Sequence, residues 1–186
     1  MAKVSPIPRG LHSLTPQLTV DGAAEAIEFY RRAFGAEERE RAPDPTGKKV
    51  WHAELRIGDS SFFINDAFPD MGGGAHPTEV WIYAANADAL YKRAVDAGAK
   101  VLMPLSDQFW GDRTGTLGDR WGNRWTVAQR VKEMTPAEMK KAGEVFVATM
   151  SVCAPTLSIA LRPTIVLPAP QGRTMTPLPP RAVPPA

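Results

Sequence analysis

The chain has 186 residues, of which 44% are hydrophobic and 23% charged, as in a globular protein with one full core or two small modules. Its net charge of +2 is too small to indicate nucleic-acid binding, and no apolar run reaches the ~18 residues of a membrane span. The single cysteine, Cys153, excludes an internal disulfide and a cysteine-cluster metal site. It fits a reducing cytoplasm, which is where we expect the protein.

A repeated unit of about 60 residues spans most of the chain. The stretch LTVDGAAEAIEFYRRAFGAEE is matched later by IYAANADALYKRAVDAGAKV, and each reads as a strand, a helix and a Gly-Ala before another strand. Tyr30 matches Tyr91, 61 positions on, and Gly58 matches Gly118, 60 positions on. Near-constant shifts indicate duplication of one unit.

Each copy predicts a βαβββ module. Asp21 and Asn86 are suited to start the two helices, and Gly35 and Gly98 to end them. The predicted strands lie near 14–20, 36–42, 48–57 and 60–66 in module one, and near 78–84, 99–103, 112–118 and 124–130 in module two.

The predicted strands alternate between apolar and polar residues, so each sheet has two different faces. Leu18, Leu55 and Ile82 belong to faces that should pack on the helices. The opposite faces should line a pocket. The fold class is therefore α+β, with two βαβββ modules forming a curved, cup-like mixed sheet and helices on the outside. Six residues are expected to surround one cavity: Gln17, His52, Glu54, Glu79, Trp81 and Arg113.

The segment DQFWGDRTG connects the second and third strands of module two, at the expected mouth of the cup. Trp110 could close over an apolar ligand, and Arg113 could donate to a carboxylate or phosphonate. Alternatively, Asp112 and Arg113 form a local ion pair and Trp110 fills the core.

The end of the chain differs in composition from the modules. EMTPAEMKKAGEVF predicts a C-terminal helix over 132–150, capped by Thr135 with Glu138 three residues on. Half of the 18 prolines lie from Pro155 onward, so 151–186 reads as an extended, disordered tail. Two alternatives for the tail are proline-rich recognition by a partner and an out-of-frame extension of a shorter parent.

The duplicated pattern resembles the vicinal oxygen chelate superfamily, which includes glyoxalase I, fosfomycin and bleomycin resistance proteins and extradiol dioxygenases. The motifs TPQLTVDGAAEAIEFYRRAFGAEE, HAELRIGDSSFFIND, DQFWGDRTG and RWGNRWTVA resemble its PhnB-like branch. The resemblance implies one domain over 11–131, with module one at about 12–67 and module two at about 76–130.

Metal-using members of this superfamily place His or Glu at four inward positions, two in each module. The resemblance places these positions at Thr15, Glu79, Thr126 and either Ile64 or Asn65. Only Glu79 is a good metal ligand, so a metal-free site with no cofactor is predicted. The alternative is a divalent ion held by another set: His52, Glu54 and Glu79.

Two functions are compatible with these features. The first is a metal-free protein of the bleomycin resistance type that binds a small organic molecule. The second is a metal-dependent lyase, isomerase or dioxygenase acting on vicinal oxygens. No catalytic residue is identified, and a homodimer is expected because many relatives pair two chains. The predicted ligand-binding residues are Gln17, His52, Glu54, Glu79, Trp81, Tyr83, Trp110 and Arg113.

Overall fold

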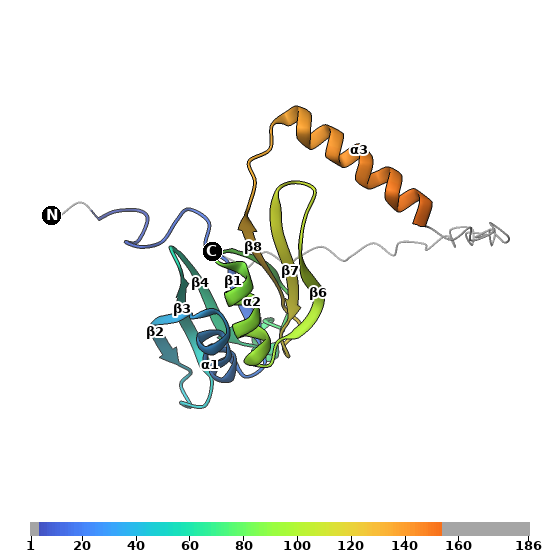
Figure 1. The fold of residues 1–186 in the computed structure, drawn as a ribbon. Helices are drawn as coiled ribbons and strands as arrows, with labels where there is room; N and C mark the ends of the chain where they lie inside the picture. Colours follow the sequence, from blue (N-terminus) through green and yellow to red (C-terminus); the bar gives the residue numbers. More distant parts are fainter. Residues whose placement is uncertain (1–3, 154–186) are drawn as a thin grey trace, which may run out of the picture.

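The computed structural model describes residues 4–153, and the predicted tail from residue 154 onward lies outside the described residues. Two βαβββ modules follow one another, and a helix follows them (Figure 1). Module one consists of β1 (Gln17–Val20), α1 (Ala23–Phe34), β2 (Glu37–Pro43), β3 (Val50–Ile57) and β4 (Ser60–Asp66). After the 3-10 helix η1 (Pro69–Met71), module two consists of β5 (Glu79–Tyr83), α2 (Ala87–Asp96), β6 (Lys100–Asp107), β7 (Asp112–Gly118) and β8 (Arg124–Arg130); α3 (Pro136–Cys153) comes last.

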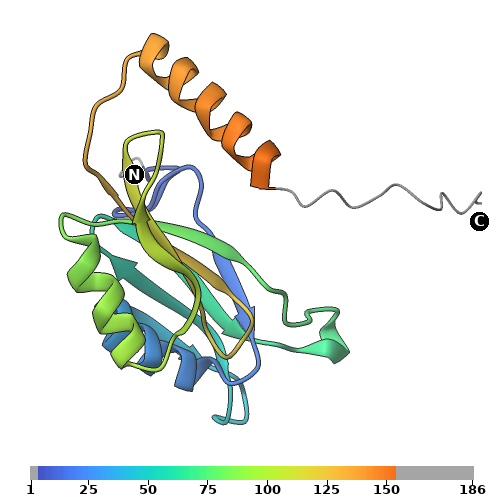
Figure 2. The same cartoon turned by 45° about the vertical axis from the view of Figure 1, so that its right-hand side comes forward.

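Each module folds its four strands into one mixed sheet. The strand orders are β1-β4-β3-β2 and β5-β8-β7-β6. The first strand of each module runs parallel to the last, and the remaining neighbours are antiparallel. Helices α1 and α2 contact each other and lie side by side against the sheets (Figure 2). The α+β class and both βαβββ modules are therefore confirmed, and the mixed sheet consists of two separate four-stranded halves.

The start of α1 is fixed by an aspartate from the end of β4. The amides of Gly22 and Ala23 donate to Oδ1 of Asp66, at 2.9 and 3.0 Å. The prediction that Asp21 caps this helix is wrong, because Gly22 occupies the cap position with φ of 86° and no side chain caps there. Gly35 ends the helix as predicted, since its φ of 68° is unfavourable for residues with a side chain.

One hydrophobic core lies between the helices and the sheets, and both modules contribute to it. The ring of Trp125 on β8 lies 4.8 Å from that of Tyr30 and 4.6 Å from that of Phe34, both on α1. The Tyr30 hydroxyl donates to Asp119 Oδ2 at 2.7 Å and accepts from Asn123 Nδ2 at 3.1 Å. Helix α1 of module one is therefore held directly by the β7–β8 turn of module two.

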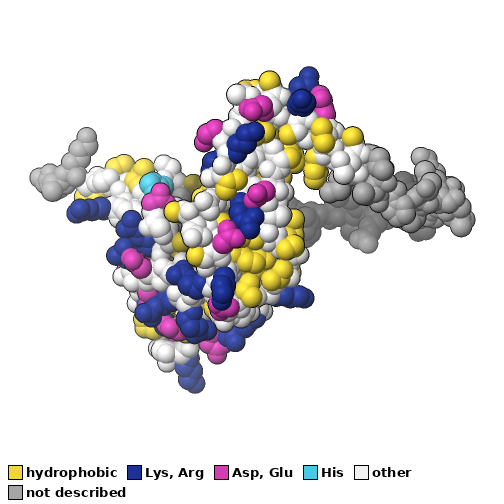
Figure 3. Space-filling view, viewed as in Figure 1, with side chains coloured by type: hydrophobic (Ala, Val, Ile, Leu, Met, Phe, Trp, Pro, Cys, Tyr) yellow, Lys and Arg dark blue, Asp and Glu magenta, His cyan; other side chains and the backbone are white. Residues whose placement is uncertain are grey.

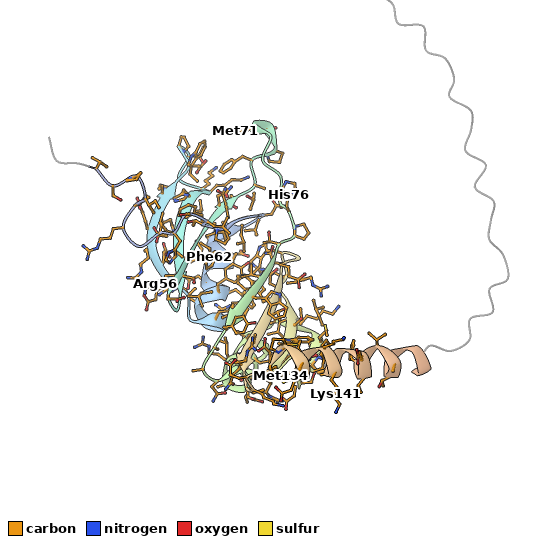
Figure 4. All side chains as sticks on the ribbon, turned by 90° about the horizontal axis from the view of Figure 1, so that it is seen from above. Arg56, Phe62, Met71, His76, Met134 and Lys141 are labelled. Atoms are coloured by element: carbon orange, nitrogen blue, oxygen red, sulfur yellow. The ribbon has the colours of Figure 1, made fainter. Side chains whose placement is uncertain are left out.

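The helix α3 begins at the predicted capping box, in which Thr135 and Glu138 exchange hydrogen bonds. It continues to Cys153, so 151–153 are helical rather than part of the predicted tail. Figure 4 shows α3 projecting away from module two, and Phe146 stacks on Phe109 with ring centroids 4.9 Å apart. Within the described residues, no helix is long and apolar enough to cross a membrane.

Candidate functional site

The strand alternation predicted from the sequence is confirmed in both sheets. Leu18, Leu55 and Ile82 are buried on the sides that face the core. Glu54 and Glu79 lie on the opposite side of their strands, which is at least partly accessible to solvent. This second side, away from α1 and α2, is here named the open face of each sheet.

On the open face of module one, the polar side chains are already paired with one another. Gln17 Nε2 donates to Asn65 Oδ1 at 2.8 Å, and Glu54 Oε1 accepts from the Ser61 hydroxyl at 2.9 Å. The His52 ring lies 4.7 Å from the ring of its neighbour Phe63. Three predicted site residues therefore share one face, and each has a partner on β4.

A cavity of about 480 Å³ lies between the two sheets beside β1 and β5; it is named the inter-sheet crevice. Its volume is within the range of ~300–1,000 Å³ that is usual for small-molecule sites. Trp81 and Tyr83 belong to its wall and are 48% and 59% exposed. Its lining consists of His12, Leu14, Pro16, Leu18, Ile57, Gly58, Asp59, Ser60, Ser61, Phe62, Val80, Trp81, Ile82, Tyr83 and Trp125.

The crevice does not gather the six residues expected to surround one cavity. Of that set only Trp81 lines it, whereas the core residues Leu18 and Ile82 also reach it. The physical reason is that the crevice follows the edge of β5, where side chains from both faces of the strand are accessible. The alternation of residues along a strand does not reveal such an edge site. Alternation assigns residues to one face or the other, whereas this site is lined by residues from both faces.

A buried aspartate connects two of the predicted aromatic residues. Asp112, which is 1% exposed, accepts from the Tyr83 hydroxyl at 3.0 Å and from Trp110 Nε1 at 3.1 Å, both through Oδ2. Its Oδ1 lies 2.7 Å from Arg130 Nε. The hydrogen bond to Asp112 raises the pKa of Tyr83. These four residues, Asp112, Tyr83, Trp110 and Arg130, are named the aspartate cluster.

Sequence reasoning missed Arg130 and gave Asp112 only a local role. The available signal was hairpin register, because Asp112 and Arg130 are direct partners on β7 and β8. Tyr83 reaches Asp112 from β5, and β8 separates these two strands. The Tyr83 ring therefore crosses β8 on the open face of module two.

Arg113 lies on the core-facing side of β7, not on the open face. Its Nε and Nη2 donate to both oxygens of Asp88 at the start of α2, and its Nη1 donates to Asp107 at 2.9 Å. These contacts raise the pKa of Arg113. The Asp112–Arg113 ion pair, which was the alternative prediction, is also absent among the described contacts. Arg113 is thus engaged by two carboxylates, which opposes the predicted role in binding an anion.

The residues at the positions implied by the resemblance do not fit a divalent ion. Asn65 Oδ1 accepts from Thr19 and Gln17, and the hydroxyls of Thr116 and Thr126 are hydrogen-bonded at 3.0 Å. Ile64 is fully buried in the core. No three His, Cys, Asp or Glu side chains among the described residues converge to hold a metal. This applies equally to the alternative set: His52, Glu54 and Glu79.

The sequence matches the family described as Glyoxalase/Bleomycin resistance protein/Dioxygenase superfamily over residues 10–127. The uncharacterized protein Mb0911c of Mycobacterium bovis is 40% identical over 139 residues, which cover 70% of this chain and 91% of that protein. Among solved structures, TioX from Micromonospora sp. ML1 is 23% identical, with a TM-score of 0.55 over 64% of this chain and 98% of TioX. A PhnB protein from Bacillus cereus is 20% identical, with a TM-score of 0.48 over 63% of this chain and 99% of that one.

Proposed function

Because the chain belongs to the glyoxalase/bleomycin resistance protein/dioxygenase superfamily, we propose that it binds a small organic molecule in the inter-sheet crevice, without a metal ion. The observation that supports binding is the crevice itself. Its size suits a small ligand, its walls are mostly apolar, and Trp81 and Tyr83 present exposed rings beside it. Burial of an apolar ligand there would remove both rings from water.

The metal-free part of the proposal rests on the donors that are present. Glu79 is the single carboxylate at the four implied positions, and it lies 3.6 Å from Arg124. Elemental analysis of protein purified without chelators is expected to find far less than one divalent ion per chain. About one tightly bound ion per chain would contradict the proposal and would favour the metal-dependent enzyme.

Ligand binding can be tested with phenylnaphthylamine, a neutral aromatic dye that fluoresces in apolar sites. We expect saturable binding of about one dye per crevice, and a roughly tenfold loss of affinity in Trp81→Ala, in line with the stacking and burial that a large ring provides. Trp51→Ala is the matched control. Trp51 is similarly exposed, at 44%, but packs on Phe68 outside the crevice. Equal affinity in wild type and Trp81→Ala would reject the crevice as the site.

We further propose that two chains form a homodimer. Among the described strands, β6 pairs with β7 alone, and its Val101, Leu102 and Met103 are exposed. Figure 3 shows hydrophobic side chains gathered on the surface on the side of β6. An exposed apolar strand edge favours pairing with another chain. Light scattering should therefore report twice the chain mass of 20.2 kDa. A mass near that of one chain at micromolar concentration would reject the dimer.

The cytoplasm is our proposed location, supported by the single cysteine in the sequence. Cell fractionation with antibodies against this chain tests it. Recovery mainly in a membrane or secreted fraction would contradict it.

A further inference from the structure

The arginine Arg130 on β8 is held by fewer contacts than Arg113 on the neighbouring strand β7. Its side chain is 46% exposed, and within the described residues its one carboxylate contact is made through Nε, to Asp112. Arg113, by contrast, uses Nε and both terminal nitrogens on Asp88 and Asp107. The terminal nitrogens of Arg130 can therefore be reached by a ligand without breaking a described carboxylate pair, as can those of Arg124, whose contact with Glu79 is also made through Nε, at 3.6 Å. Of these two arginines, Arg130 contacts the carboxylate to which the Tyr83 hydroxyl donates.

Asp112 is an immobile ion-pair partner for the Arg130 guanidinium. The carboxylate is buried, and its Oδ2 is held by two aromatic donors, so it cannot follow a moving side chain. Oδ1 lies 2.7 Å from Arg130 Nε but accepts no aligned hydrogen bond among the described residues. The ion pair thus restrains Arg130 by charge while leaving it free to turn its planar edge toward an incoming acceptor.

The aspartate cluster adjoins the crevice because both include Tyr83. This residue lines the crevice, and its hydroxyl contacts Asp112. The ring of Trp81 lies 6.3 Å from that of Tyr83, with an interplanar angle of 31°, so the two form a continuous aromatic surface. The carboxylate that contacts Arg130 lies at the hydroxyl end of the Tyr83 ring, so an apolar body packed along this surface toward that end would approach Arg130.

We propose that the ligand is a small aromatic acid, whose body packs on Trp81 and Tyr83 and whose anionic group pairs with the terminal nitrogens of Arg130. The inference rests on the proposed function and names the ligand class for the same site. Carboxylate and sulfonate groups both match the planar donor pair of a guanidinium. Asp112 offsets part of the positive charge, so the preference for an anion should be moderate rather than absolute.

Two dyes that differ by one anionic group test this directly. Anilinonaphthalene sulfonate and phenylnaphthylamine share the same aromatic body, and only the first has a sulfonate. Arg130→Gln should weaken sulfonate binding about tenfold, as expected for one charge-assisted contact, and leave the neutral dye unchanged. Arg113→Gln is the matched control and should leave both affinities unchanged, because Arg113 faces away from the open face.

A measurement on the wild type guards against a folding defect in Arg130→Gln. Naphthoate should displace the neutral dye at about tenfold lower concentration than naphthylmethanol, which has the same ring and no charge. Equal displacement by both, or equal sulfonate binding in wild type and Arg130→Gln, would overturn the inference while the crevice remained a binding site. If neither dye binds the wild type saturably, the inference and the proposed function both fail.

Discussion

Module one and module two share a topology but bury very different amounts of their helices. Helix α1 has seven buried residues, whereas α2 has two, Ala87 and Ala94. The cause is the different position of the two helices relative to the other module. α1 packs on its own sheet and on the β7–β8 turn of module two, where Tyr30 meets Asp119. Tyr91 makes no described hydrogen bond to the other module, because its hydroxyl donates to the Met103 carbonyl within its own module. Duplication therefore set the topology, and the packing of one copy on the other set the burial.

The outer strands and open faces differ in the same systematic way. Strand β2 has the charged sequence EERERAP, which discourages pairing with another chain, whereas β6 exposes Val101, Leu102 and Met103. The open face of module one has a polar network around Asn65, and that of module two has the aspartate cluster. Module one thus forms most of the shared core. Module two presents the apolar and aromatic surfaces that can meet a ligand or a partner.

The largest expected effect comes from the residues that fix the two helix starts. Asp66 accepts from Gly22 and Ala23 through Oδ1, and from Val50 through Oδ2 at 2.7 Å. Removing these three acceptor contacts in Asp66→Ala should cost roughly 3 kcal/mol of unfolding free energy, because two buried amides and one partly buried amide lose their partner.

The matched variant in module two is Gln129→Ala. Gln129 occupies the corresponding place and accepts one hydrogen bond, from the Ala87 amide at 3.0 Å. Its removal should cost only about 1 kcal/mol. Urea unfolding followed by circular dichroism measures both. Equal losses would show that the modules do not differ in how strongly their helices are tied to the sheet.

The next comparison uses the two tyrosines that duplication made equivalent. Tyr30→Phe removes the hydroxyl between Asp119 and Asn123 and should cost about 1.5 kcal/mol near neutral pH. Tyr91→Phe removes one hydrogen bond at a half-buried site and should cost less, about 0.5 kcal/mol.

The pH dependence of this pair has a definite sign. Burial, and then the Asp119 carboxylate, raise the pKa of Tyr30 above its ordinary value. A raised pKa contributes stability that is complete below the ordinary tyrosine pKa of about 10 and is lost as the pH rises above it. The difference in unfolding free energy between wild type and Tyr30→Phe should therefore shrink above that pH. A difference that stays constant into the alkaline range would contradict this account.

The topology was predicted well from the sequence because local sequence patterns determine it. Period-two strands, helical stripes and the glycine that ends α1 act over a few residues, and Asn86 caps α2 as its position indicated. The cap of α1 was mispredicted because Asp66 lies 44 positions from Gly22 and joins it only in the folded sheet. Nothing near the helix start distinguishes Asp21 from a true cap.

The candidate site was predicted less well because it depends on contacts between elements. Trp81, Tyr83 and Trp110 were named, and the structure places them at the crevice or in the aspartate cluster. Arg113 was predicted because it stands in a glycine-bounded segment, whereas Arg130 was missed. The register along β7 excludes Arg113 from the open face, since Asp112 points to that face and the next residue points away from it. The crevice itself arises from two sheets meeting, which no single motif encodes.

The smallest expected effect concerns the ion pairs of Arg113, which have no equivalent in module one. Arg113 joins the first turn of α2, through Asp88, to the end of β6, through Asp107. These contacts lie at the surface, where water and salt screen them, so Arg113→Gln should lower the thermal midpoint only slightly. The loss should disappear at about 1 M salt. It should also disappear in acid, because hydrogen bonds from Arg113 lower the pKa of Asp88, and stability gained this way is lost as the pH falls below about 4.

The control for this variant is Arg41→Gln in module one. Arg41 pairs with Glu38 through two hydrogen bonds of 2.7 and 2.8 Å, but both residues belong to β2, so the pair joins no separate elements. We expect a smaller change than for Arg113→Gln, measured by differential scanning calorimetry in the same buffers. An effect of Arg41→Gln larger than that of Arg113→Gln would mean that the charged strand β2 contributes to stability as well as discouraging pairing with another chain. The proposed difference between a pair within β2 and the pairs that join α2 to β6 would then be wrong.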